Sequence, residues 1–496
     1  MRRPISLLIA CFVTILSTYS QIGIKDPKTG KFIPINGIGV FSEYKSTNYN
    51  KPTRDLSKVE IVATNKPATV KVTSVFSLNY SYAEPGFFGR LLLKSEATNA
   101  ANDGRIANTP ESKFHYTLER LSSVPQQYVR PGLLRTPGTA SVFKTGSGMF
   151  ITPDGYVLTN AHVIELDDAS AKDQVAKSVA QQLVISELQH YADHFGAQSF
   201  DQALMDKTQA IMLHYLSQFV YLNSKVPSYS IQTGHSIGNR QYRLPALMVT
   251  KGNPIPGKDV AILKTDVTDV PSIAFGKASD LEIGEDLYLL GYPGVVDNNM
   301  DLDQDVLEEP TFATGMASSW QQTKTGWKAL GFDGNAAKGN SGGPVFNKRG
   351  EVIGMLTFGS FDINGQTLKQ GYNFIVPTQV IAEFIRKAGV QPAIGDLDNK
   401  YRQAVLDYTS DKYQSALDTF RLVKTAQPAW PYIDDYISKA SSKASSQSLG
   451  FQPVKVGEQK KGLARLWQIL QDAGIKWYTI VIAIIVIGGG IIRLFR

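Results

Sequence analysis

The string GNSGGP, from Gly339 to Pro344, constrains this 496-residue chain more than any other segment. Glycines on both sides of a serine predict a sharp turn that exposes the hydroxyl and aims backbone N–H groups at one point. A serine that attacks a carbonyl needs both features, because negative charge develops on the carbonyl oxygen during the attack. Ser341 is therefore a candidate nucleophile. The alternative is an ordinary surface turn between two strands.

Two further segments favour the first interpretation. TGSGMFITPDGYVLTNAHVI, from Thr145 to Ile164, predicts two short strands joined at a Pro-Asp-Gly turn and followed by a step that presents His162. In KDVAILKTD, Asp259 precedes a strand-like apolar run. In such a set His162 acts as general base for Ser341, while Asp259 orients the imidazole and stabilises its protonated form. Each residue alone is ambiguous, and the three together indicate nucleophilic catalysis.

The segments TNAHV, DVAILK and GNSGGPVFNKRGEVIGM resemble the His, Asp and Ser motifs of trypsin-like serine proteases, and within them the Deg/HtrA branch. GYPG, from Gly291, and ATGMAS, from Ala313, resemble strand ends of the same branch. The match is scattered over residues 66–386. It implies a mainly β, chymotrypsin-like double β-barrel with the triad in its cleft. It also implies an oxyanion hole formed by the backbone N–H groups of Gly339 and Ser341.

Two asparagines depart from the digestive members of that family. Asn340 stands where an aspartate would pair with a newly cut amino terminus, and a neutral amide cannot anchor an ammonium group in that way. Activation by insertion of the N-terminus is therefore not expected. Asn335 stands where an aspartate would select Arg or Lys, so the resemblance points to small or medium apolar side chains at the cleavage site.

Charge and composition exclude several functions. The formal net charge is +7, but Arg2, Arg3, Arg493 and Arg496 supply four of these charges from the two apolar ends. The remaining excess is too small to predict nucleic-acid binding, and no basic stripe is interleaved with aromatic residues. No cofactor or metal is expected. His190 and His194 lie four residues apart on a predicted helix, yet no third ligand is evident, so a solvated face is the preferred interpretation over a zinc site.

The apolar sequences at the two ends of the chain predict secretion and membrane anchoring. Residues 1–20 have the pattern of a secretory signal peptide, with lipidation at Cys11, the only cysteine, as an alternative. Residues 475–495 predict a single transmembrane helix, because sixteen residues from Trp477 to Ile492 carry no charge between Lys476 and Arg493. A buried or interfacial helix is the alternative there. The protease domain is therefore expected outside the cytoplasm, in the periplasm or the extracellular space.

Between these ends the chain divides into a leader at 21–57, a protease domain at 58–390, a helical module at 396–445 and a linker at 446–474. The protease domain carries insertions at about 80–138 and 165–240. The second insertion predicts a helix that stops at Gly196 and another that runs to about Tyr221, forming a lid, a docking surface or a structural brace. Asn364-Gly365 predicts a hairpin turn, and residues 379–387 predict the closing helix.

In the helical module, small and aromatic residues recur at spacings that resemble one tetratricopeptide hairpin, with an ordinary packed helix pair as the alternative. These residues are Ala404, Tyr413, Ala416, Phe420 and Pro428. No segment of this sequence visibly resembles the PDZ domain that is usual in Deg/HtrA proteins. The segment SSKASSQS at 441–448 predicts a flexible spacer.

The resulting hypothesis is a membrane-anchored serine endopeptidase that hydrolyses polypeptides through an acyl-enzyme, in protein quality control or regulated proteolysis. The alternative is a membrane-tethered scaffold with an inactive barrel, whose helical module binds a protein partner. The oligomeric state is left open.

Overall fold

The computed structural model describes residues 23–25, 32–34, 46–86, 90–196, 202–234, 243–294, 309–361 and 368–448. The predicted signal peptide, transmembrane helix and most of the predicted linker lie outside these residues. Within the part of the chain that the structure describes, no helix is both long and apolar enough to cross a bilayer. Strands β1 (Gly23–Lys25) and β2 (Phe32–Pro34) form a small two-stranded sheet in the leader.

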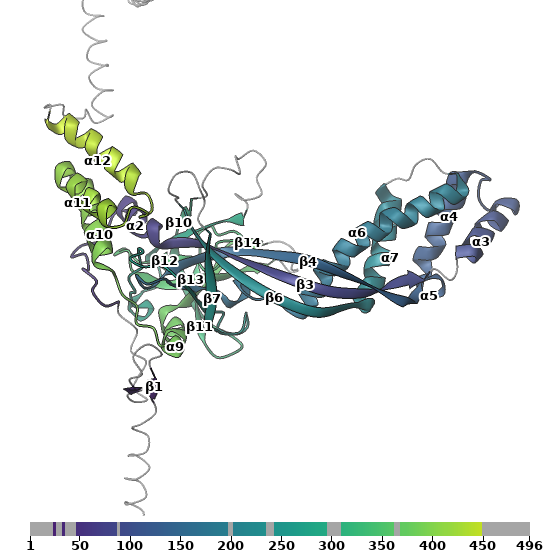
Figure 1. The fold of residues 1–496 in the computed structure, drawn as a ribbon, viewed down its shortest axis with the longest axis horizontal. Coiled ribbons are helices and arrows are strands. Elements are labelled where there is room, and N and C mark those ends of the chain that lie inside the picture. Colours follow the sequence, from purple (N-terminus) through teal and green to yellow (C-terminus); the bar gives the residue numbers. More distant parts are fainter. Residues whose placement is uncertain are drawn as a thin grey trace, which may run out of the picture.

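The protease domain contains the predicted pair of β-barrels, each closed by six antiparallel strands (Figure 1). The first barrel has the order β3-β4-β5-β8-β7-β6 and the second has the order β10-β11-β14-β13-β12-β9. The strands of the first barrel are β3 (Thr69–Gly86), β4 (Arg130–Phe150), β5 (Tyr156–Thr159), β6 (Val220–Thr233), β7 (Arg243–Lys251) and β8 (Ala261–Thr265). Those of the second are β9 (Asp286–Gly291), β10 (Thr311–Gln322), β11 (Lys328–Phe332), β12 (Pro344–Phe346), β13 (Val352–Phe361) and β14 (Leu368–Pro377).

Short connections match several sequence predictions. Gly155 has a φ of +94° between β4 and β5, where the Pro-Asp-Gly turn is predicted. The predicted turn at Asn364-Gly365 lies outside the described residues, but the strands that flank it pair antiparallel from Phe361↔Leu368 onward. The closing helix is α9 (Thr378–Ala388), which ends at Gly389 in the left-handed conformation. Its apolar face packs into the cluster shared by both barrels.

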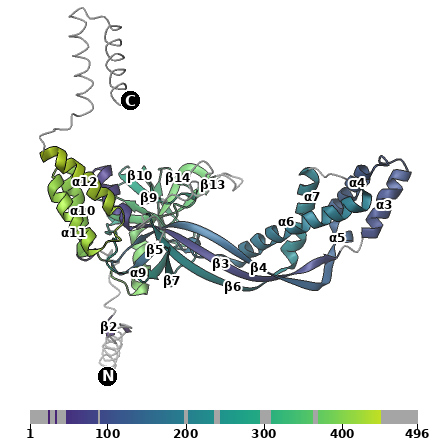
Figure 2. The same ribbon diagram turned by 45° about the horizontal axis from the view of Figure 1, so that its top comes forward.

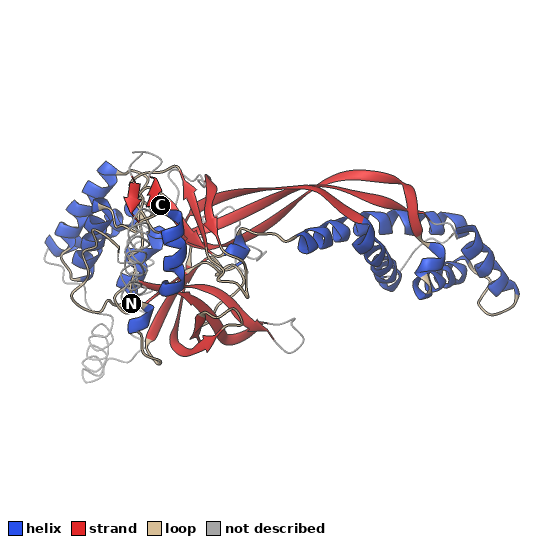
Figure 3. Cartoon of the chain, turned by 90° about the horizontal axis from the view of Figure 1, so that it is seen from below, coloured by secondary structure: helices blue, strands red, loops and turns tan. Residues whose placement is uncertain are grey.

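Three strands of the first barrel continue far beyond it and form an arm. β3 pairs with β4 from Thr69↔Met149 to Gly86↔Arg130, and with β6 from Val70↔Thr233 to Tyr82↔Val220. The 18 residues of β3 span about 60 Å at the rise of a strand. Figures 1, 2 and 3 show this three-stranded ribbon leaving the barrels and ending among helices.

Both insertions lie on this one arm, and the sequence does not predict that they meet. The first contributes α3 (Arg90–Asn102), α4 (Pro110–Ser123) and α5 (Pro125–Tyr128), and the second contributes α6 (Asp168–Phe195) and α7 (Gln202–Phe219). The predicted insertion at about 80–138 contains the outer ends of β3 and β4 together with α3, α4 and α5. Thr109 caps α4 through the Ser112 N–H, with Pro110 in the first turn, so a start signal was available there.

A separate hydrophobic core holds the arm together. Val175, Val179 and Leu188 of α6 are buried against α4, α7 and the ribbon, as their helical spacing predicts, while the exposed Gly196, with a φ of +74°, follows the helix. Tyr215 of α7 donates a hydrogen bond from Oη to Ala83 O, at 2.9 Å, on β3. The arm is therefore a packed unit carried by the first barrel, and its helices pack on the ribbon (Figure 3).

The C-terminal module has three helices: α10 (Asp396–Thr409), α11 (Tyr413–Ala426) and α12 (Ile433–Ser448). Ala404, Ala416 and Phe420 are buried in its core, where the hairpin prediction places them. The prediction of a flexible spacer at 441–448 is wrong, because α12 continues through Ser448. Burial of Ile433 and Ala440 fixes the first part of this helix, and the Ser, Ala and Lys residues that follow continue it.

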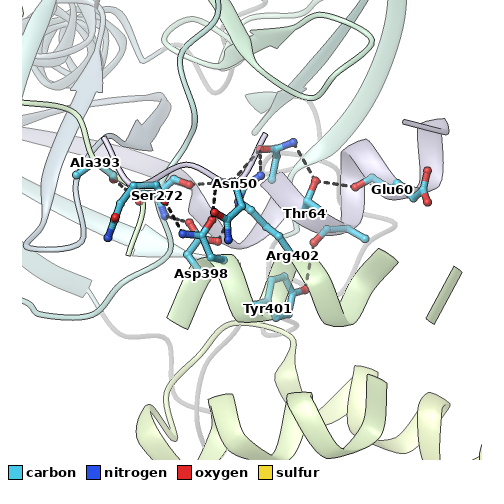
Figure 4. A network of polar contacts seen from close by, with 12 residues as sticks. Asn50, Glu60, Thr64, Ser272, Ala393, Asp398, Tyr401 and Arg402 are labelled. Atoms are coloured by element: carbon cyan, nitrogen blue, oxygen red, sulfur yellow. Dashed lines mark hydrogen bonds and ion pairs between the residues drawn. The ribbon is translucent and has the colours of Figure 1, made fainter. Parts of the chain in front are cut away.

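A buried polar network attaches this module to the protease domain (Figure 4). Arg402 pairs with Asp398 at 3.2 Å and donates to Ser272 O at 2.8 Å, while the Ser272 N–H donates to Asp398 at 2.9 Å. Burial raises the pKa of Asp398, and Arg402 and the Ser272 N–H oppose that shift. Asn65, at the end of α2 (Lys58–Asn65), accepts from the Arg402 guanidinium. These hydrogen bonds are buried, so water does not compete for them. They therefore fix the orientation of the module on the protease domain.

Glu60 adds a second link between α2 and the module. Its carboxylate accepts from Arg54 at 2.6 and 2.9 Å, from the Ser57 N–H in a capping box, and from Thr409 of α10 at 2.7 Å. The end of the leader therefore packs on α2, since Ser57 caps this helix and Arg54 pairs with Glu60 in its first turn. Residue Thr47 also exchanges backbone hydrogen bonds with Pro392 and Ile394.

We expect Glu60→Gln to destabilise the fold by about 1–2 kcal/mol at pH 7, a value discounted because the Arg54 guanidinium is half exposed. The hydrogen bonds from Arg54 lower the pKa of Glu60 from 4.5 to about 2, against the opposing effect of burial. A lowered folded-state pKa stabilises the protein above the unfolded value and loses that effect as the pH falls from about 4.5 to about 2. Urea unfolding at several pH values checks this, because the variant and the parent should converge in that window. An unchanged difference at acidic pH would contradict it.

Candidate active site

The structure brings His162 and Asp259 into direct contact in the first barrel. His162 lies on the short 3₁₀ turn Ala161–Val163 after β5, and Asp259 lies two residues before the start of β8. His162 Nδ1 is 2.7 Å from Asp259 Oδ2, and the His162 backbone N–H donates to Oδ1 at 2.9 Å. The Asp259 side chain is fully buried, whereas the imidazole is about one third exposed. A carboxylate here makes Nδ1 the protonated nitrogen, which leaves Nε2 able to accept a proton.

The backbone holds Asp259 in an unusual conformation. Its φ is +51°, a left-handed value that Asp and Asn tolerate better than most residues. The Asp259 N–H donates to Asn253 O at 3.0 Å, and its carbonyl accepts from Asn160 Nδ2 at 2.8 Å. These bonds fix the carboxylate in place under the imidazole.

The turn that carries Ser341 has the predicted glycine geometry. Gly339 and Gly342 have φ values of +100° and +88°, and a Cβ on Gly342 would lie 2.0 Å from Ser147 O. Among the described backbone hydrogen bonds, the N–H groups of Gly339 and Ser341 donate to no acceptor in the chain. They are therefore available to a negatively charged oxygen, as the prediction of an oxyanion hole requires.

Ser147 of β4 ties this turn to the first barrel and was missed by sequence reasoning. Its N–H donates to Ser341 O and its hydroxyl donates to Gly339 O, both at 2.7 Å, while the hydroxyl accepts from the Tyr292 N–H at 2.8 Å. The side chain is fully buried. The small residues on both sides of it, Gly146 and Gly148, were the available signal, since each approaches a neighbouring side chain or carbonyl too closely for a Cβ.

Thr357 of β13 joins the nucleophile to the acid and was also missed. Its hydroxyl donates to Asp259 Oδ2, and its carbonyl accepts from Ser341 Oγ at 3.0 Å. In the described part of the chain, Ser341 thus donates to Thr357 and not to His162. A change of the Ser341 rotamer is needed before the proton can pass to the imidazole. A threonine in an apolar strand carries no sequence signal of this position.

The two asparagines behave differently. Asn340 is buried, and its Oδ1 has no partner among the described atoms. The side chain that would receive a new amino terminus is thus neutral and enclosed beside Gly291. Asn335 is exposed, so the structure does not enclose it at the base of a pocket.

A groove of about 900 Å³ lies between the loop that leads into Asp259 and the second barrel, and none of the three triad candidates lines it. Ile255 and Pro256, from the loop that leads into Asp259, form one wall. The second barrel forms the other, through β10, β11 and β14. Phe374 in this wall pairs with Phe358, the residue after Thr357.

No group of three or more His, Cys, Asp or Glu side chains suited to a metal occurs among the described residues. His190 and His194 are exposed on α6, which packs in the arm. Partial burial lowers the pKa of both, and for His190 the neighbouring Arg90 and Lys94 lower it further.

We expect Thr357→Val to lower kcat/KM about tenfold, equivalent to about 1.4 kcal/mol in the barrier. The valine keeps the volume but removes the hydroxyl that orients the Asp259 carboxylate. Thr357→Ser is the matched control, because it keeps the hydroxyl and should retain most of the activity. Hydrolysis of a peptide substrate by the two variants checks this. Equal losses in both would show that the methyl group, not the hydroxyl, is what the site needs.

Comparison with known proteins agrees with this geometry. The Trypsin-like peptidase domain matches residues 218–355, a stretch that contains Asp259 and Ser341 but begins in the last turn of α7, within the arm, and so omits His162. A probable periplasmic serine endoprotease DegP-like of Hahella chejuensis is 23% identical over 313 residues, covering 61% of this chain and 48% of that protein. Serine protease HTR4 of Rattus norvegicus is 31% identical over 138 residues, covering 26% and 24%.

The chain thus spans about half the length of the first relative and about a quarter of the second. The solved structure of HtrA-type protease AlgW with decapeptide aligns over 68% of this chain and 69% of that one, at 15% identity and a TM-score of 0.34. Two closed six-stranded barrels, the peptidase-domain match and the HtrA and DegP relatives together support a trypsin-like serine protease of the Deg/HtrA type.

Proposed function

We propose that this protein is a serine endopeptidase in which His162, Asp259 and Ser341 form the catalytic triad. The observation that carries the proposal is the contact between Asp259 and His162 beside the glycine-rich turn of Ser341. In this turn the N–H groups of Gly339 and Ser341 donate to no described backbone acceptor. A protein that acts only as a binding scaffold has no need for a His–Asp contact, a glycine-rich serine turn and available N–H groups in one place.

The reaction follows from these positions. Ser341 Oγ leaves Thr357 O, gives its proton to His162 Nε2 and attacks the scissile carbonyl, while the N–H groups of Gly339 and Ser341 stabilise the resulting oxyanion. Protonated His162 gives the proton to the leaving amine, and an acyl-enzyme remains on Ser341. Water then attacks the ester with His162 again as base, which releases the acid and restores the serine. Asp259 stays ionised throughout and stabilises the imidazolium.

Substrates are proposed to be extended polypeptides with small or medium apolar residues at the cleavage position. The support is the resemblance to the Deg/HtrA branch, together with the groove of about 900 Å³ between the 255–256 loop and the second barrel. Vacating Thr357 O also frees a backbone acceptor for the bound peptide.

A fluorophosphonate probe tests the proposal directly. We expect labelling of the full chain, with the adduct located by mass spectrometry on the peptide that contains Ser341, and with His162→Ala labelled far more slowly. A folded protein that neither reacts with the probe nor cleaves casein would favour the scaffold hypothesis. Proteomic mapping of cleavage sites would then test the apolar preference.

We further propose that the enzyme works outside the cytoplasm and is anchored by residues 475–495, with a role in quality control or regulated proteolysis and a protein partner for the C-terminal module. The support is the apolar sequence at both ends and a DegP-like relative whose name describes it as periplasmic. Protease added to sealed spheroplasts should digest the body of the protein but spare a tag placed after Arg496. Release of the protein by a high-salt wash would contradict a spanning anchor.

A further inference from the structure

The far end of the arm exposes two pairs of leucines that contribute little to the core. Leu91 and Leu92, in the first turn of α3, are 82% and 56% exposed, and Leu133 and Leu134, near the start of β4, are 104% and 72% exposed. We call these four residues the tip leucines. Gly86, at the end of β3, pairs with Arg130 and lies four residues before α3, so both pairs belong to the same end of the arm (Figures 1 and 2).

A β-bulge pushes the second pair out of the ribbon. Ala83 pairs with Arg135 and Pro85 pairs with Pro131, so three residues of β4 stand opposite one residue of β3. Gly132 is needed there, because a Cβ would lie 2.9 Å from Glu84 O. The extra residues of the bulge are the two leucines, which therefore project into solvent instead of packing on the sheet.

The first pair of tip leucines, Leu91 and Leu92, is followed in the chain by a leucine that is buried. Leu93 is fully buried and joins the core of the arm, whereas Leu91 and Leu92 are exposed. The helix is therefore anchored by one leucine and presents the other two outward. A surface helix has no structural need for such residues, and exposed apolar groups of this kind mark contact sites.

Cations flank both leucine pairs. Arg90 and Lys94 bracket the first, and Arg130 and Arg135 bracket the second; we call these four the tip cations. Arg90 and Lys94 act electrostatically on His190 of α6, which shows that the second insertion adds two imidazoles to the same end. Arg135 lies over the Tyr221 ring at 4.2 Å. Residues 90–137 hold seven Lys and Arg against four Asp and Glu, whereas residues 165–177, at the barrel end of α6, hold two Lys against four Asp and Glu.

Paired leucines that project between cations fit a soft anionic surface. Leucines can enter the boundary between headgroups and acyl chains while Lys and Arg remain at the phosphates. A protein partner would instead require a pocket or a broad apolar face for these side chains. Four pockets formed by the described residues lie on the barrels and beside the start of α10, and none of these four is lined by residues of α3 or by the start of β4.

We propose that the end of the arm binds the surface of an anionic phospholipid bilayer through the tip leucines and the tip cations. The site acts independently of catalysis, and it holds the protease domain at a distance set by the length of the arm. It does not depend on the proposed anchor, which lies at the other end of the chain.

A local probe tests the proposal in the full chain, since residues 475–495 could by themselves bring the protein to vesicles. Cys11 is the only cysteine, so Cys11→Ser with Leu134→Cys gives one site for an environment-sensitive fluorophore. On vesicles of phosphatidylcholine with phosphatidylglycerol we expect a blue-shifted emission that spin-labelled lipid quenches. The matched control is Gln181→Cys, exposed on α6, which should stay unchanged.

Charge variants complete the test. Arg90→Gln with Lys94→Gln should weaken the probe response at least tenfold, while Lys172→Gln with Lys177→Gln on α6 should not. Hydrolysis of a soluble peptide should be the same in all four backgrounds, and Ser341→Ala should bind vesicles normally, which separates this proposal from the proposed function. An unshifted emission on anionic vesicles that carry the protein would overturn it. So would an equal response on pure phosphatidylcholine, or a response to protein concentration without lipid, which would indicate contact between copies.

Discussion

Ser341→Ala should lower kcat by about a million-fold, leaving only the small acceleration that an oxyanion hole and substrate binding provide. The variant removes one oxygen whose described hydrogen bond goes to Thr357 O. Because the turn is shaped by Gly339 and Gly342 and tied down by Ser147, its backbone should not change. Casein turnover and fluorophosphonate labelling, measured beside thermal unfolding, check the expectation.

Ser95→Ala, at an exposed position on α3, is the control and should retain full activity and labelling. The unfolding temperature of Ser341→Ala should stay close to that of the parent. Activity that survives in a folded Ser341→Ala variant would show that another residue is the nucleophile.

Asp259→Asn should lower kcat about ten-thousand-fold with the fold intact. The amide keeps the shape of the side chain and can still accept from the His162 N–H. Its NH₂ group, however, would face Nδ1 and stabilise the tautomer that carries the proton on Nε2. That nitrogen could then no longer accept the proton of Ser341.

Asp259→Ala separates this electronic effect from a structural one. Alanine at a φ of +51° is strained by about 1–2 kcal/mol, and the His162 N–H and the Thr357 hydroxyl would lose their acceptor. We expect comparable loss of activity in both variants, with a clear fall in unfolding temperature only in Asp259→Ala. If Asp259→Asn remained as active as the parent, Asp259 would not be the group that orients the imidazole.

Several elements were predictable because their signals are local. The helical spacing of Val175, Val179 and Leu188 predicts α6, and Gly196 follows its last residue, Phe195. The glycines around Ser341 predict a turn that side chains with a Cβ could not form. His162 and Asp259 stand in short motifs whose neighbours specify their strand ends, so the contact between them could be expected.

Other features depend on contacts between distant segments. Ser441–Ser448 has the composition of a flexible linker, yet it is helical because the first part of α12 is buried in the module. Thr357 and Ser147 look like ordinary small polar residues in strands. Their roles arise from partners that are 98 and 192 residues away in the chain.

By itself, the sequence predicted the candidate site residues and the periodic helices, since each of these predictions rests on a motif or a spacing among neighbouring residues. Only the tertiary structure decided that the two insertions share one arm, because the ribbon of β3, β4 and β6 forms by pairing across distant residues. It also decided that the C-terminal module is fixed to the barrel. That attachment depends on burying Asp398, Arg402 and Asn65 together, and no spacing in the sequence encodes the match.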